Sequence, residues 1–208
     1  MQVKKINWFG LFGGILVLVV LVVSIYYPWW QLIVGENLLK VNASPVNTNF
    51  GLLGTQFTIP IIWALNVASI LTLLSSGIVM LIYSVMPIKS YSKDLLSFAY
   101  RKPLYAVVFS LVGLLIAMLA AKAAFGINIP LTGTSTIILP SSFTMGINIS
   151  ILISTAFQWP FWLAIVAAGL CIAARIYHMK LSSAAKQAPA APAVIQATPT
   201  TQPATATE

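Results

Sequence analysis

Charged residues are scarce in this chain of 208 residues. Asp, Glu, Lys and Arg make up only 7% of it, while 59% of the residues are hydrophobic. A soluble domain carries about 25% charged residues. With so few charges, the surface of a water-soluble globule would be one continuous apolar patch. The composition therefore excludes an ordinary soluble fold and predicts an integral membrane protein, whose apolar solvent is the bilayer.

Side chains that carry out catalysis or bind metals are almost missing. The chain has one histidine, His178, one cysteine, Cys171, and three acidic residues, Glu36, Asp94 and Glu208. Serine-hydrolase, H-E-x-x-H and phosphate-loop motifs do not occur in the sequence. A metal held by His178 would need further ligands, and no second histidine exists; a single axial haem ligand, or a haem shared with another subunit, is the alternative to an interfacial polar residue. We therefore expect no catalytic residue, cofactor or metal in this chain.

The excess of basic residues is explained by membrane orientation better than by nucleic acid. Eleven Lys and Arg residues against three acidic residues give a net charge of +8. These basic residues flank long apolar runs, as the positive-inside rule describes. We therefore expect no nucleic-acid partner.

Four apolar runs are long enough to cross a bilayer. Twenty residues of α-helix cover about 30 Å, which matches the hydrocarbon core. Backbone hydrogen bonding in lipid requires such runs to be helical. The predicted spans are residues 8–27, 60–87, 104–124 and 159–177. The first run is too long for a signal-peptide core and no A-x-A-like site follows it, so we expect it to be retained.

Basic and aromatic residues agree on one orientation. With the N-terminus in the cytoplasm, nine Lys and Arg residues lie inside, and only Lys40 and Lys122 lie outside. Trp8 then falls at an inner span end and the other five tryptophans at outer ends, and indole rings prefer the headgroup level. We therefore predict a multi-pass protein of the cell membrane with both termini in the cytoplasm.

The inner loop and the C-terminal tail are both hydrophilic. The inner loop, residues 88–103, is basic, and we expect it to contact anionic headgroups; a docking site for a partner is the alternative. The tail, residues 182–208, consists mostly of Ala, Pro, Thr and Gln. Such a segment cannot bury enough apolar surface to offset its chain entropy, so we predict that it is disordered. Residues 1–181 form the membrane domain.

Both outer loops, residues 28–59 and 125–158, contain short β-prone runs. In the first, WQLIV and LLKV flank Gly-Glu-Asn, and in the second, INIPL and TIILP flank TGTS. Each pattern predicts a hairpin. The two hairpins could pair into one small sheet, which would be more stable than either alone. As an alternative for part of the second loop, residues 144–157 could be helical and extend the fourth span to a kink at Pro160.

Each outer loop also contains one N-x-S/T sequon. The acceptor residues are Asn42 and Asn148. Glycans are added to outer loops, so these two residues are the predicted glycosylation positions.

Small residues recur at a spacing of four within the spans. Such stripes let membrane helices approach closely, and they serve packing within one bundle or docking onto another subunit. The predicted packing residues are Gly10, Gly14, Ala64, Ala68, Thr72, Ser76, Gly113, Ala117, Ala121, Ala164 and Ala168. Asn66 and Ser69 add hydrogen-bonding groups within the second span that should face protein.

The spans hold almost no ionisable group, which disfavours ion-coupled transport. We therefore expect a non-catalytic accessory, assembly or scaffold subunit that contacts membrane lipids and associates with other subunits or with itself. One alternative is a small-solute or lipid transporter or channel component whose path is lined by Asn66, Ser69, Thr72 and Ser76. The other is a cofactor-free subunit of a membrane redox complex.

The segment PWWQLIVGENLLKV directly follows the first span. Together with four spans and inside termini, it resembles the architecture of the claudin and peripheral-myelin-type proteins. The resemblance implies an all-α four-helix membrane bundle with a small extracytoplasmic β cap. The first loop of that family normally carries a Gly-Leu-Trp motif and a cysteine pair, whereas this chain has Gly51-Leu52-Leu53 and no cysteine there. The likeness therefore concerns the fold alone.

Overall fold

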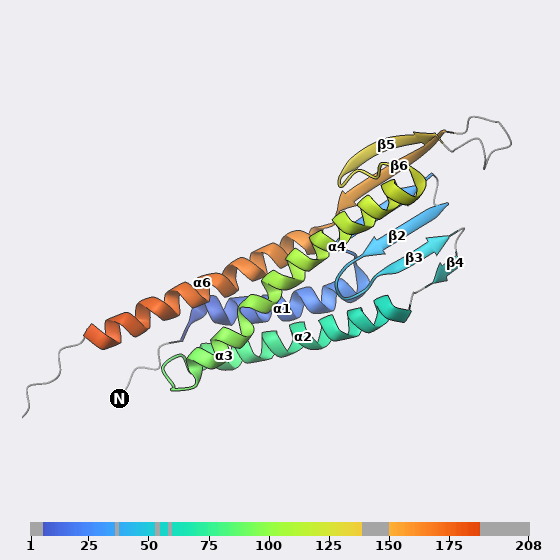
Figure 1. The fold of residues 1–208 in the computed structure, drawn as a ribbon. Coiled ribbons are helices and arrows are strands. Elements are labelled where there is room, and N and C mark those ends of the chain that lie inside the picture. The colour runs from blue at the N-terminus through green and yellow to red at the C-terminus, as the bar shows by residue number, and fades with distance from the viewer. Residues whose placement is uncertain (1–5, 36–37, 53–54, 58–59, 139–149, 188–208) are drawn as a thin grey trace, which may run out of the picture.

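A bundle of long helices carries an antiparallel sheet at one end (Figure 1). The computed structural model describes residues 6–35, 38–52, 55–57, 60–138 and 150–187. Its helices are α1 (Trp8–Tyr26), α2 (Pro60–Val85), α3 (Ser92–Ala99), α4 (Arg101–Phe125) and α6 (Trp159–Gln187). Its strands are β1 (Trp30–Val34), β2 (Leu39–Ala43), β3 (Asn49–Leu52), β4 (Thr55–Phe57), β5 (Gly133–Ile138) and β6 (Ser150–Phe157). We call the two ends of the bundle the sheet end and the far end.

Among the described residues, four helical stretches are long and apolar enough to cross a membrane, as expected for a multi-pass membrane protein. They are Trp8–Tyr26, Ile62–Val85, Ser92–Ala123 and Trp159–Lys180. The third stretch joins α3 and α4, so much of the segment predicted as an inner loop is helical. Helix α6 continues to Gln187, past the predicted start of the tail, and residues 188–208 lie outside the described residues.

Packing against α2 explains why α3 forms in the predicted loop. Leu96 and Ala99 of α3 are fully buried. The hydroxyl of Ser76 on α2 donates a hydrogen bond to the carbonyl of Ala99, with 2.8 Å between Oγ and O. Half of the residues of α3 are charged or polar, so its buried face was not recognised from the sequence.

Helix α1 is the centre of the bundle and packs between α2 and α6. Three of its glycines make this close approach possible. A Cβ at Gly10 would lie 2.6 Å from the Ser84 Oγ, and a Cβ at Gly13 would lie 3.2 Å from the Cys171 Sγ. A Cβ at Gly14 would lie 3.2 Å from the backbone oxygen of Gly77. The glycine face of α1 is therefore used within this chain.

A buried asparagine joins three helices at the far end. Asn7 is the N-cap of α1, and its Oδ1 accepts a hydrogen bond from the Gly10 amide at 3.2 Å. Its Nδ2 donates to the Tyr83 hydroxyl of α2 at 2.8 Å and to the Ala174 carbonyl of α6 at 3.1 Å. Its backbone amide donates to the Ser84 carbonyl at 3.0 Å. Asn7 is fully buried, so it sets the level at which the three helices meet.

The two outer loops form one sheet with strand order β4-β3-β2-β1-β6-β5. Strands β1 and β2 form the predicted first hairpin, and Gly35 takes a positive φ of 59° in its turn. The loops are joined by β1 and β6, which pair antiparallel from Trp30 opposite Phe157 to Val34 opposite Ile153. The prediction that both loops contribute to a single small sheet is confirmed.

The prediction of the second hairpin was wrong. Strand β5 pairs with β6, not with the INIPL run, and Ile138 lies opposite Ser150. The irregular segment before β5 crosses the sheet instead, where the Leu131 carbonyl accepts a hydrogen bond from Trp30 Nε1 at 2.8 Å. The helical extension of the fourth span is also wrong for residues 150–157, which are strand β6, while 144–149 lie outside the described residues. Pairing with β1 outweighs any local helical preference there.

The sheet is fixed to the bundle by a buried tryptophan. Trp29 is 1% exposed, and its Nε1 donates to the Ser24 hydroxyl of α1 at 2.7 Å. Its ring meets Phe161 of α6 edge-on, with 6.1 Å between centroids. Beside it, the Asn47 Nδ2 donates to the Ile25 carbonyl at the end of α1 at 2.7 Å. Helices α1 and α6 therefore hold the sheet in a fixed position.

Replacing Asn7 by alanine should destabilise the bundle by about 2–4 kcal/mol, because the cap is lost and two buried polar groups lose their partner. Asn7→Ser keeps a capping hydroxyl and should lose less. Thermal unfolding of the purified protein in detergent measures both. Wild-type stability of Asn7→Ala would contradict this role.

Gly13→Val should destabilise the bundle by about 1–3 kcal/mol, because the new methyl groups would overlap α6. The matched control is Gly113→Val, at a helical glycine whose Cβ would have no neighbour within 4 Å. That variant should unfold like the wild type in the same detergent assay. Equal losses for both variants would refute the packing account.

Candidate interaction surface on α4

The predicted packing residues fall into two groups. Gly10, Gly14 and Ser76 are buried, as are Ala164 and Ala168 of α6. The other six are exposed, except for the half-buried Ala121: Ala64, Ala68, Thr72, Gly113, Ala117 and Ala121. The stripes of α1 and α6 thus serve contacts within this chain. The small-residue stripes of α4, and of α2 before Ser76, are mostly exposed.

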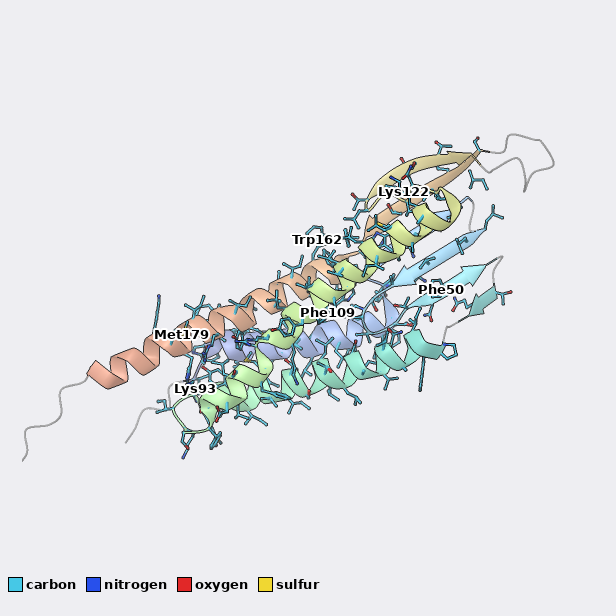
Figure 2. All side chains as sticks on the ribbon, viewed as in Figure 1. Phe50, Lys93, Phe109, Lys122, Trp162 and Met179 are labelled. Carbon is cyan, nitrogen blue, oxygen red and sulfur yellow. The ribbon has the colours of Figure 1, made fainter. Side chains whose placement is uncertain are left out.

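Helix α4 is the least covered of the long helices. The most apolar stretch of the span formed by α3 and α4 is 11% buried. The corresponding stretches of α1 and α6 are each 39% buried. Nothing lies within 4 Å of a Cβ placed on Gly113. Phe109 projects from this outward side of α4 (Figure 2) and is 69% exposed. Close packing inside the described chain therefore does not account for the small residues of α4.

Helix α1 gives a scale for depth along the bundle. Its 19 residues cover about 28 Å, close to the thickness of the hydrocarbon core. Aromatic rings pair across helices at both of its ends: Tyr27 with Trp159 at the sheet end, 5.7 Å apart, and Phe9 with Tyr177 at the far end, 5.9 Å apart. Such aromatic pairs are typical of the two membrane interfaces.

On this scale, α4 is displaced toward the sheet end. Ser84 bonds the N-cap of α1, and Ser76 lies eight residues further along α2, or about 12 Å by helix rise. Because Ser76 bonds Ala99, helix α4 begins near the middle of α1. Ala106 of α4 and Val17 of α1 line the same small gap, so they lie at similar levels along the bundle. Helix α4 therefore starts about halfway along the bundle.

The second half of α4 consequently lies beside the sheet. Leu114 is buried in one cluster with Trp30, Leu32 and Ile153, and Met118 packs against that cluster. Figure 1 shows this end of α4 next to β6, beyond the end of α1, and Figure 2 places Lys122 there. On the other side of α4 lie three exposed residues: Leu115 (49% exposed), Ile116 (62%) and Leu119 (66%). We call these three the outer apolar patch.

The displacement also puts two basic residues at mid-bundle depth. Arg101 and Lys102 directly follow the Ala99–Tyr100 junction, in a segment that the sequence analysis assigned to the inner loop. The Arg101 Nε donates to the Tyr100 hydroxyl at 2.7 Å. The ammonium of Lys102 lies 3.1 Å from the centroid of the Phe98 ring. Sequence reasoning missed the level of these residues along the bundle, because the buried α2–α3 contact that shifts them toward the sheet end is not visible in the sequence.

The four polar positions proposed for a transport path differ in their exposure. Asn66 is buried, Ser69 is half-buried and Thr72 is exposed, while Ser76 bonds Ala99. The internal gap lined by Val17 and its neighbours has a volume of about 10 Å³ and an apolar lining. None of those four side chains lines this gap.

The remaining candidates are isolated groups. No cluster of three or more potential metal ligands occurs among the described residues. His178 meets Tyr83 edge-on at 5.5 Å, and Cys171 is buried against α1. Asn42 lies in β2, where its Oδ1 accepts a hydrogen bond from Gln31 at 2.7 Å. The second sequon, at Asn148, lies outside the described residues.

Comparison with known proteins supplies no relative: no protein-family model matches this sequence, and no curated protein matches it.

A cysteine at position 119 should react with a water-soluble maleimide in membrane vesicles, and a cysteine at position 108 should not. Both changes are made with Cys171 replaced by serine. Leu119 and Val108 are both exposed on α4, but only Leu119 directly follows Met118, which packs against the sheet cluster. Protection of both positions, in a preparation shown to be free of partner proteins, would contradict the displacement of α4.

Proposed function

We propose that this chain is a non-catalytic accessory, assembly or scaffold subunit of a membrane complex, and that it docks through α4. The outer apolar patch is the observation that carries the proposal. A helix beside a water-exposed sheet should be polar on its outer side, whereas a helix that is apolar all round is normally buried. Lipid can cover exposed residues at the depth of α1, but the patch lies beyond that depth. We therefore expect another protein to cover the outer apolar patch.

The orientation follows from the basic residues. We place the far end of the bundle, with both termini, in the cytoplasm and the sheet outside. The far end carries Lys89, Lys93, Arg175 and Lys180, whereas the sheet end carries Lys40 and Lys122 among the described residues. In intact cells the position-119 cysteine should therefore be labelled from the outside, and a cysteine at the exposed Ser90 only after permeabilisation. The reverse pattern would invert the topology.

Co-purification tests the function directly. The tagged protein is extracted in mild detergent, separated on a native gel and analysed by mass spectrometry for stoichiometric partner chains. The double variant Ile116→Gln, Leu119→Gln should reduce recovery of the partner by about ten-fold or more, because two large apolar contacts are lost. The matched control is Leu152→Gln, at a leucine of β6 that is 57% exposed and lies outside the patch. It should retain the partner.

Two results would refute the proposal. In the first, the wild-type protein behaves as a monomer with no partner under the mildest extraction that keeps it soluble. In the second, the patch variant and the control recover the partner equally well.

A further inference from the structure

Arg101 and Lys102 are cations for which the described chain supplies only aromatic partners. The guanidinium carbon of Arg101 lies 5.3 Å from the centroid of the Tyr100 ring, and that of Arg175 lies 5.6 Å from the same ring. Lys102 is folded onto Phe98. Such cation–π contacts are attractive, but they leave the net charge in place.

No carboxylate neutralises this pair within the described residues. Asp94 is the one acidic side chain there, and it lies on the first turn of α3, about two helical turns nearer the far end than Arg101. The hydrogen-bond partner of Arg101 is the Tyr100 hydroxyl. A charge at this depth is costly in lipid and normally faces protein or water, paired with another group.

We infer that Arg101 and Lys102, with the exposed side of α4 around them, form a binding site for a neighbouring membrane helix that carries an Asp or Glu at matching depth. This inference rests on the proposed function and specifies the chemistry of the partner. A planar guanidinium can hold a carboxylate with two parallel hydrogen bonds, which fixes both the depth and the rotation of the incoming helix.

The depth of the pair favours a carboxylate on a helix over a lipid phosphate. Arg and Lys snorkel effectively near helix ends, where headgroups are within reach. The backbone of Arg101 follows Ala99, about 12 Å from the level of Ser84, while its guanidinium and the Lys102 ammonium turn back onto Tyr100 and Phe98. The surface that continues from it toward the sheet end is apolar and open, with Tyr105 46% exposed and Phe109 69% exposed. A helix seated there would cover the cations, these rings and the outer apolar patch in one contact.

Charge removal at matched positions tests the inference. The full-length protein is compared with Arg101→Leu, Lys102→Leu and with Lys89→Leu, Lys93→Leu, which removes the same charge from exposed positions at the far end. The first double variant should lower recovery of the partner by about ten-fold or more, and the second should leave it unchanged. Arg101→Lys keeps the charge but not the paired hydrogen bonds, so it should recover less partner than the wild type and more than the double leucine variant. Native-gel mobility and thermal unfolding in detergent verify that each variant is folded.

The identity of the partner completes the test. Mass spectrometry should identify a chain with an Asp or Glu inside a predicted span. Neutralising that residue should reproduce the loss, and exchanging it with Arg101 should restore binding. If the wild-type protein has no partner, both this inference and the proposed function are wrong. If the partner is retained by the Arg101→Leu, Lys102→Leu variant, only this inference is wrong. It is also wrong if that variant loses a co-purifying anionic lipid and keeps the partner.

Discussion

The hydrogen bond from Ser76 to the Ala99 carbonyl fixes the level of α4, and the distinctive features of the molecule depend on that level. It ties the start of α4 to a position about 12 Å from the far end of α2, measured by helix rise. Buried Leu96 holds α3 against α2 just before this point. As a result, the third apolar stretch is shifted toward the sheet, which brings Leu114 to the sheet and Arg101 to mid-bundle depth.

The rest of the bundle is built around α1, which is fixed to its neighbours at both ends. Asn7 fixes one end of α1 to α2 and α6, and Trp29 fixes the other end to the sheet. Between them, Gly13 and Gly14 bring the neighbouring helices into direct contact. These contacts leave α1, α2 and α6 as a tightly joined unit. Helix α4 lies across that unit with most of its surface open, which is why we propose it as the site of association.

The sequence was sufficient for the features that depend on local composition. Apolar runs predicted the four helical stretches, and Gly-Glu-Asn between two β-prone runs predicted the β1–β2 hairpin. The sequence predicted that the two loops could share one sheet, but not which strands would pair. The β1–β6 pairing is a contact between residues more than a hundred positions apart, and no local pattern specified its register.

The candidate site was harder to predict, because it arises from an offset between helices. Gly113 and Ala117 were recognised as small residues, but the sequence did not reveal that they are exposed while Gly10 and Gly14 are buried. Arg101 and Lys102 were assigned to a basic loop, since their charges suggested an interface. Only the packing of α3 on α2 shows that they lie deeper. Asn7 was missed as well, although an asparagine directly before an apolar helix is a common N-cap signal.

The depth of residue 101 tests the account most directly. A spin label at Arg101→Cys, with Cys171 replaced by serine, is measured in liposomes by its accessibility to oxygen and to a water-soluble nickel complex. A label at position 90, in the exposed segment after α2, provides the reference for the interface. The account predicts that residue 101 is more accessible to oxygen and less accessible to nickel than residue 90, as expected well inside the hydrocarbon core. Equal accessibilities at the two positions would place α4 at the ordinary depth of a membrane span and contradict the account.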